Sequence, residues 1–233
     1  MTGFATTRWS LVLRARQEPR EARVALDALC AMYRPPVLAY IRARGYQADA
    51  AEDLAQTFFL HFVERAYHAD ADPTRGRFRA FLVTAIKCFL IDSDKYDRRL
   101  KRGGGVVPHS LDHEPGITPV ASDDPEAAFE RTWAITILDA AVSKLRDEAE
   151  HSGKGAWFAQ LSEFLVEPAD KADYARAAAA LNMRANTLAV AVHRLRQRLQ
   201  ELVIAELKET VVSEADINDE LGVLRASLRE PVV

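Results

Sequence analysis

The sequence predicts an all-α protein made of two helical domains joined by a flexible linker. Apolar residues recur with helical periodicity along most of the chain, strand-like alternation is almost absent, and one segment rich in glycine and proline interrupts the pattern. The chain has 233 residues, 48% hydrophobic and 28% charged, which is the composition of folded domains rather than of a disordered polymer. This length suits one large domain or two small ones.

The first predicted domain spans residues 22–102 and begins with a helical pattern over residues 24–46. One face of that pattern is apolar, and the pair Pro35–Pro36 predicts a kink or a break. Residues 1–21 form an N-terminal extension whose helical stripe would pack on this domain. That stripe consists of Trp9, Val12 and Leu13.

Two further helices complete this domain. In "EDLAQTFFLHF" (52–62), the side chains of Asp53, Gln56 and Thr57 form one polar patch, because residues three and four apart are neighbours on a helix. After a turn at "DPTRG" (72–76) comes "FRAFLVTAIKCFLID" (78–92). The apolar face of this last helix is Phe78, Phe81, Leu82, Ala85, Phe89 and Leu90.

The linker is predicted at residues 103–126, which contain three consecutive glycines and four prolines and show little periodicity. The second helical domain follows at residues 127–202. Residues 203–233 form an acidic C-terminal extension that includes a short helix at 216–228.

Residues 173–202 have the pattern of a helix-turn-helix. A first helix with small inner residues is followed by Asn182, which tolerates the left-handed backbone of a turn. The second helix has a buried stripe and an opposite face that carries Arg184, Thr187 and Arg194. A recognition helix presents such a face to the major groove. The alternative is an Arg-rich surface helix in a bundle. The predicted inner residues are Ala177, Ala178, Leu181, Leu188, Val192, Leu195 and Leu199.

Charge is segregated along the chain although the net charge is only −3. Residues 75–102 contain nine basic and three acidic residues, whereas residues 201–220 contain seven acidic residues and one lysine. Binding responds to local potential rather than to the whole-chain average, so the basic segment predicts an anionic partner such as nucleic acid.

Together these pieces resemble a bacterial RNA polymerase sigma factor of the extracytoplasmic-function (ECF) class, within the sigma-70 family. Residues 53–56 (Asp-Leu-Ala-Gln) with Phe59-Leu60 carry part of the resemblance. Residues 78–92 are similar to the usual FRxWLxxIAxNxxxD helix. Residues 174–199 are similar to YxEIAxxLGISxGTVKSRLHRARxRL. The resemblance covers residues 22–102 as region two and 127–202 as region four.

The resemblance implies a protein that binds core polymerase and directs it to promoter DNA. Region two would dock on the β′ clamp helices through Asp53, Gln56 and the position of Thr57, and region four would contact the β flap. Basic side chains, Phe81 and Cys88 would meet the −10 element, and the second helix of the helix-turn-helix would read the −35 element. The implied −10 residues are Arg75, Arg77, Arg79, Phe81, Lys87 and Cys88. The implied −35 residues are Arg184, Asn186, Thr187, Arg194, Arg196 and Arg198.

Three departures from the family pattern bear on function. Thr57 stands where a further acid is usual in the family. Because a phosphate on Thr57 would supply negative charge at this position, we hypothesise that a Ser/Thr kinase activates polymerase binding by phosphorylating Thr57. The alternative is that the Thr57 hydroxyl makes a neutral hydrogen bond. Cys88 stands where asparagine is frequent, and it also suits a small buried site. Ala189-Val190-Ala191 replaces Lys-Ser-Arg, which predicts −35 binding driven largely by phosphate contacts.

The sequence also argues against other functional classes. No pattern of nucleophile, base or phosphate loop predicts catalysis, and we expect no cofactor and no metal. Two cysteines give no disulfide framework, and no export signal or membrane span is apparent, so we expect a cytoplasmic protein without a membrane partner. No anti-sigma partner is evident.

The alternative function is a stand-alone helix-turn-helix regulator that binds DNA as a dimer, and an adaptor is a third candidate. The acidic C-terminal tail is a candidate to fold back on region four, either as a structural cap or as an inhibitor of DNA binding.

Overall fold

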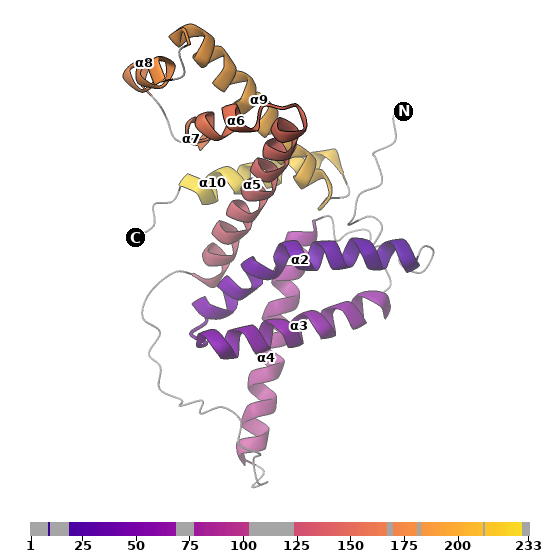
Figure 1. The fold of residues 1–233 in the computed structure, drawn as a ribbon. Coiled ribbons are helices and arrows are strands. Elements are labelled where there is room, and N and C mark those ends of the chain that lie inside the picture. Colours follow the sequence, from indigo (N-terminus) through magenta and orange to yellow (C-terminus); the bar gives the residue numbers. More distant parts are fainter. Residues whose placement is uncertain are drawn as a thin grey trace. The chain divides into compact units, whose positions relative to one another are not determined.

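The computed structural model describes Trp9 and residues 19–68, 77–102, 124–166, 170–180, 183–211 and 213–229. Within these ranges the chain is all-α, with nine helices and one isolated β-bridge between Arg77 and Val211. The chain divides into two compact units (Figure 1). Unit 1 is Met1–Thr136 with Leu207–Val233, and unit 2 is Ile137–Glu206. Most of the predicted linker, the predicted turn at 72–76, and Val12, Leu13, Arg75, Leu181 and Asn182 lie outside the described residues.

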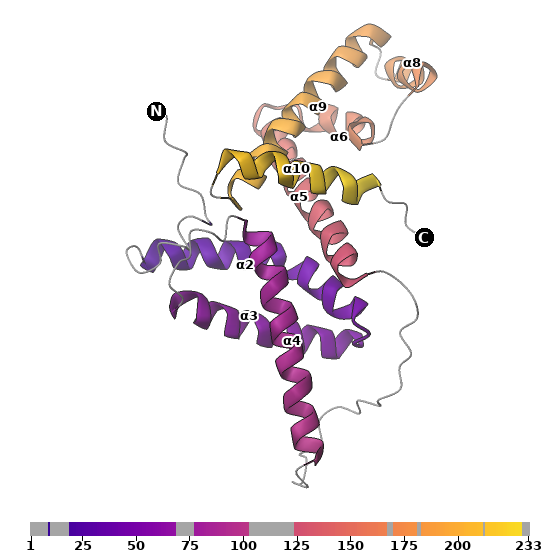
Figure 2. The ribbon, with the colours of Figure 1, turned by 180° about the vertical axis from the view of Figure 1, so that it is seen from behind.

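Unit 1 is built on α2 (Pro19–Ala43), α3 (Ala48–His68) and α4 (Phe78–Arg102). α2 and α3 lie side by side and antiparallel, and α4 crosses both of them (Figures 1 and 2). The tight connection between α2 and α3 contains Gly45, whose φ is 95°, a left-handed conformation that glycine adopts without steric cost.

The sequence predicted a kink or a break at Pro35–Pro36. No break occurs, because α2 is one continuous helix. Tyr33, Val37 and Ile41 are fully buried along its inner face, and this burial stabilises the helix across the two missing N–H donors. Continuity also makes the segment Arg20–Ala43 long and apolar enough to cross a membrane, contrary to the expectation that no segment is. Half of its apolar window is buried inside the structure.

The core of unit 1 extends beyond the predicted first domain. Trp133, on the first part of α5 (Pro125–His151), donates a hydrogen bond from Nε1 to the Tyr33 hydroxyl at 3.1 Å. Trp9 is buried, and its ring lies 5.0 Å from that of Phe78. This confirms, for Trp9, the prediction that the N-terminal extension packs on the first domain. α5 therefore begins in unit 1, and the predicted domain start at 127 does not coincide with the boundary between the units.

The C-terminal extension belongs to unit 1 from Leu207 onward. α10 (Glu214–Arg229) buries Ile217 and Leu224, and the backbone N–H of Phe78 donates to the carbonyl of Thr210 at 3.0 Å. The predicted helix at 216–228 is confirmed. The carboxylates of α10 pair with Arg77, just before α4, and with Arg79 in the first turn of α4. These are attractions between opposite charges within unit 1.

Unit 2 contains the rest of α5, then α6 (Gly155–Leu161), α7 (Glu163–Val166), α8 (Lys171–Ala180) and α9 (Ala185–Lys208) as far as Glu206. Asp170 and Asp173 each accept a hydrogen bond from the other's backbone N–H, which caps the start of α8. The predicted inner face is confirmed for Ala178, Leu188 and Val192, which pack with buried side chains of the preceding helices. That cluster consists of Leu161, Phe164, Ala178, Leu188 and Val192.

Candidate functional site

The first candidate surface is the polar face of α3. Asp53, Gln56 and Thr57 are all exposed and lie within one turn of each other on this helix. The Thr57 hydroxyl donates to the backbone carbonyl of Asp53 at 2.9 Å, so it already has a neutral hydrogen-bond partner within its own helix. The structure thus brings the three predicted polymerase-binding residues together on an open surface.

An apolar groove of about 670 Å³ lies beside this polar face, between α2 and α3. Gln56 and Leu60 line it from α3, and Leu60 is 59% exposed. Cys30 lines it from α2; burial, with Asp27 nearby, raises the pKa of its thiol to about 12, so the thiol stays protonated at neutral pH. An exposed apolar patch edged by polar groups is typical of a protein interface.

The second candidate surface is the start of α4, where the predicted −10 residues lie. Arg79 is only 8% exposed, and its guanidinium donates to Glu220 at 3.0, 3.1 and 3.3 Å and to Glu130 at 2.5 Å. The guanidinium also lies 5.0 Å from the centre of the Trp133 ring. Arg79 is therefore inaccessible to DNA in this structure, and its contacts are those of a structural residue.

Arg77 and Lys87 are also paired with acids, but they remain accessible. Arg77 lies 3.6 Å from carboxylate oxygens of both Asp219 and Glu220, and its side chain is 32% exposed. Lys87 forms an ion pair with Glu126, and its side chain is 40% exposed. The hydrogen bond from Lys87 to Glu126 raises the pKa of the lysine, so its charge is retained.

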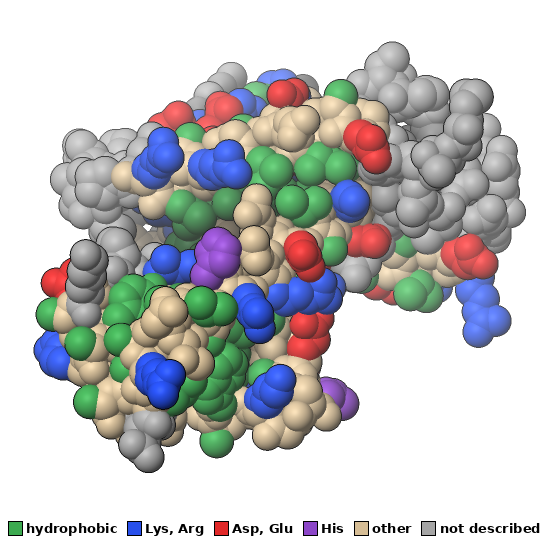
Figure 3. Space-filling view, turned by 90° about the horizontal axis from the view of Figure 1, so that it is seen from above, with side chains coloured by type: hydrophobic (Ala, Val, Ile, Leu, Met, Phe, Trp, Pro, Cys, Tyr) green, Lys and Arg blue, Asp and Glu red, His purple; other side chains and the backbone are tan. Residues whose placement is uncertain are grey.

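The two remaining described −10 residues differ in accessibility. Phe81 is half-buried, with its ring 5.4 Å from that of Trp9 and 5.5 Å from that of Phe62. Cys88 is exposed, so it does not occupy the small buried site that was the alternative for it. Figure 3 shows acidic and basic side chains interspersed on one face of the molecule.

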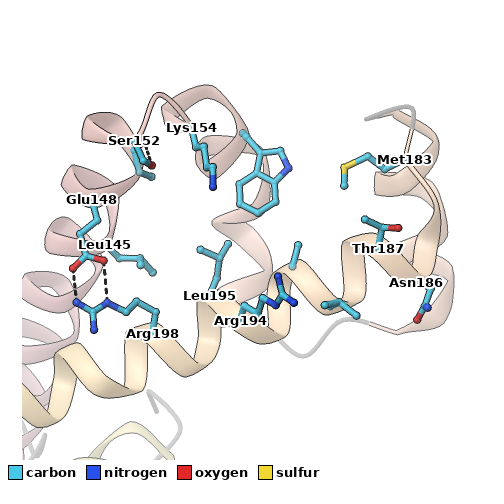
Figure 4. Close-up of a pocket in the computed structure, with 14 residues that line it drawn as sticks. Leu145, Glu148, Ser152, Lys154, Met183, Asn186, Thr187, Arg194, Leu195 and Arg198 are labelled. Atoms are coloured by element: carbon cyan, nitrogen blue, oxygen red, sulfur yellow. Dashed lines mark hydrogen bonds and ion pairs between the residues drawn. The ribbon is translucent and has the colours of Figure 1, made fainter.

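The third candidate surface is α9 in unit 2. Arg184, Asn186, Thr187 and Arg194 are exposed at its start and along its outer face. Asn186, Thr187 and Arg194 border a groove of about 800 Å³, into which Lys154 points from the opposite side (Figure 4). Of the three apolar residues at 189–191, Val190 is 44% exposed, whereas Ala189 and Ala191 are half-buried.

Two other predicted −35 residues make contacts within the protein. Arg196 donates to the backbone carbonyl of Phe164 at 2.6 and 2.9 Å. Arg198 donates to both oxygens of Glu148, at 2.7 and 3.0 Å, and to Glu201 at 2.6 Å (Figure 4). The spacing of three residues between Arg198 and Glu201 could have indicated one of these pairs. The partnership with Glu148 has no local sequence signal.

Comparison with protein families matches residues 29–100 to Sigma-70 region 2. The match covers α4 almost to its end, all of α3, and α2 from Leu29 onward. No curated protein and no solved structure matches the chain. Residues 29–100 are thus a sigma-70 region 2 domain.

Proposed function

We propose that this chain is a sigma factor of the ECF class, in which unit 1 binds core polymerase and the −10 element and unit 2 serves as region four at the −35 element. A sigma-70 region 2 domain implies promoter recognition together with core RNA polymerase, and sigma factors are not enzymes. The observation that carries the proposal is the region 2 match on three packed helices. The chain would act in the cytoplasm, where polymerase is.

The polymerase-binding role rests on the surface of α3. Asp53 and Gln56 are exposed beside the apolar groove, which gives one surface both polar contacts and apolar area for a helical partner. We assign the β′ clamp helices to this surface. The side chains on the opposite face of α3, such as Ala55 and Phe58, are buried and pack in the core of unit 1.

The region-four role rests on the packing of α8 against α9. Ala178 packs with Leu188 and Val192, so the two helices approach closely, and the connection between them is short. Four polar or basic residues at the start and outer face of α9 are exposed, as DNA contact requires. We retain Arg184, Asn186, Thr187 and Arg194 as −35 contacts. Arg196 and Arg198 would act mainly by holding α9 in place.

The test of this function is reconstitution with core polymerase on promoter DNA. The full chain should co-migrate with core polymerase, and the complex should open a promoter and initiate transcription. Asp53→Ala should weaken core binding at least tenfold, because an interfacial charge-assisted contact contributes about 1.5–3 kcal/mol. Asp49→Ala, also on α3 but in its first turn, is the matched control. Strong binding to a palindromic duplex without core polymerase would favour the stand-alone regulator instead.

We also propose that phosphorylation of Thr57 by a Ser/Thr kinase strengthens core binding. The side chain is exposed beside Asp53, so a kinase can reach it, and a phosphate would add about −1.5 to −2 charge at this surface. Thr57→Glu should then bind core polymerase more tightly than Thr57→Ala. Thr84→Glu is a matched control, because the Thr84 hydroxyl is also exposed and donates to a carbonyl four residues earlier, on α4. Equal core binding by Thr57→Ala, Thr57→Glu and phosphorylated wild type would refute the switch.

A further inference from the structure

The predicted −10 cations that the structure describes share one feature: all three are paired with carboxylates from outside the matched region 2 domain. Arg77 is paired with α10, Arg79 with α10 and α5, and Lys87 with the first turn of α5. All of these residues belong to unit 1. We call the acids the covering carboxylates: Glu126, Glu130, Asp216, Asp219 and Glu220.

We propose that covering carboxylates pair with the predicted promoter-binding cations Arg77 and Lys87 in the free chain, and that DNA phosphates displace these carboxylates from both cations. This inference rests on the proposed function of α4 at the −10 element. A carboxylate and a phosphate present similar oxygen acceptors to a guanidinium or an ammonium group, so they compete for the same cation. The chain would thereby lower the affinity of its own free form for DNA.

Arg77 has the geometry of a cation that can be released. Its three carboxylate partners lie at 3.6–3.9 Å, longer than a charge-assisted hydrogen bond. Asp219 is 67% exposed, so no packing holds its carboxylate in place. Exposed pairs of this kind stabilise a fold only weakly, and a polyanion can therefore displace them.

Lys87 repeats the arrangement ten residues further along the chain. Its partner Glu126 lies in the first turn of α5 and is 50% exposed. The pair joins two different helices, so the carboxylate can move aside without unwinding α4. Two separate elements thus place an exposed acid on the two accessible cations.

Unlike Arg77 and Lys87, Arg79 is expected to keep its carboxylate partners when DNA binds. Its side chain is 10% exposed and that of Glu220 is 1% exposed, so breaking this pair would leave buried charges without partners. The backbone bond between Phe78 and Thr210 also holds the C-terminal segment against the start of α4. We therefore assign Arg79 and Glu220 to a fixed attachment, while Asp219 and Glu126 are the exchangeable acids.

The experiment measures binding of a fluorescent single-stranded oligonucleotide with the −10 non-template sequence of a promoter that the reconstituted polymerase transcribes. The full chain is measured both free and assembled with core polymerase, and the salt concentration is varied. Asp219→Asn and Glu126→Gln should each tighten binding about two- to fivefold, the range that exposed ion pairs allow. Each freed cation should also steepen the dependence of log affinity on log salt by about 0.7.

Glu214→Gln is the matched control. It removes one negative charge from the exposed first turn of α10, and the structure records no ion pair between Glu214 and the described cations of α4. It should change binding by less than either test variant and leave the salt slope unchanged. Arg77→Gln should weaken binding and abolish the gain from Asp219→Asn.

The outcomes separate this inference from the proposed function. If the wild-type complex forms and binds the oligonucleotide but Asp219→Asn and Glu126→Gln match Glu214→Gln, the covering carboxylates do not compete with DNA and the inference is wrong. An unchanged affinity in Arg77→Gln would also overturn it. If wild type fails to assemble with core polymerase, the proposed function fails first. Thermal melting of each variant checks that the fold is retained.

Discussion

Arg79 and Glu220 are 141 residues apart in the chain, yet the Nε of Arg79 donates to both carboxylate oxygens of Glu220, at 3.0 and 3.3 Å. The first residue belongs to the region 2 domain and the second to the C-terminal helix. Both side chains are almost fully buried. In a buried pair of this kind, each charge compensates the other, so removing one partner leaves the other as an unpaired buried charge. The C-terminal helix is thereby a structural part of unit 1.

Replacing Glu220 should destabilise unit 1 strongly. Removing one partner of a buried pair costs about 3–5 kcal/mol, and we expect Glu220→Gln to lie near the lower end because Glu130 still faces Arg79. Urea unfolding followed by circular dichroism measures the free energy. Asp219→Asn, one residue away and mostly exposed, should cost less than about 1 kcal/mol. Equal losses in the two variants would contradict the structural role of the pair.

Truncation after Leu202 should unfold unit 1 rather than expose a recognition helix. It removes the buried Val211, Ile217 and Leu224, each contributing about 1.5–3 kcal/mol, in addition to Glu220. The sum is comparable with the whole stability of a domain, about 5–15 kcal/mol. Limited proteolysis should therefore cleave α2–α4 rapidly in the truncated chain. A truncated chain in which these helices resist protease as well as in the full chain would refute this.

The sequence was most informative where contacts are local. The polar patch of Asp53, Gln56 and Thr57 follows from helical spacing, and the buried face of α9 follows from apolar periodicity. The contacts of Arg79 did not follow, because nothing in local spacing relates it to Glu220. A basic segment and a distant acidic segment predict attraction to anions and to cations respectively. They do not reveal that each is the other's partner.

The same limit explains the domain boundaries. Trp133 lies in a helix that is continuous from Pro125 to His151, so periodicity assigns its residues to one element. The hydrogen bond from Trp133 to Tyr33 assigns the start of that helix to unit 1. Likewise, the continuity of α2 through Pro35–Pro36 depends on the burial of Tyr33 and Val37. Intrinsic helix propensity takes no account of such tertiary packing, so it could not predict this continuity.

Unit 2 should lose stability in acid through Glu148. The hydrogen bonds from Arg198 hold the pKa of Glu148 below its ordinary value in the folded protein. A lowered folded-state pKa gives stability that is fully present above the unfolded pKa, about 4.3 for a glutamate, and is lost as pH falls through the folded pKa. Glu148→Gln should therefore flatten the decline in unfolding midpoint between about pH 5 and pH 3. Glu150→Gln, exposed on the same helix, is the control, and an equal change in both variants would contradict the assignment.

The two cysteines should differ in reactivity, and the difference provides a probe of the α4 surface. Cys30 has a pKa of about 12, because its thiolate would be buried and near Asp27, so alkylation at pH 8 should be slow. Cys88 is exposed next to Lys87 and should be alkylated at least tenfold faster, as measured by mass spectrometry of digested protein. Cys30→Ser removes the slow site and is the control. If Cys88 lies against promoter DNA, a −10 oligonucleotide bound to the assembled polymerase should slow its alkylation. An unchanged rate would show that this face of α4 points away from the DNA.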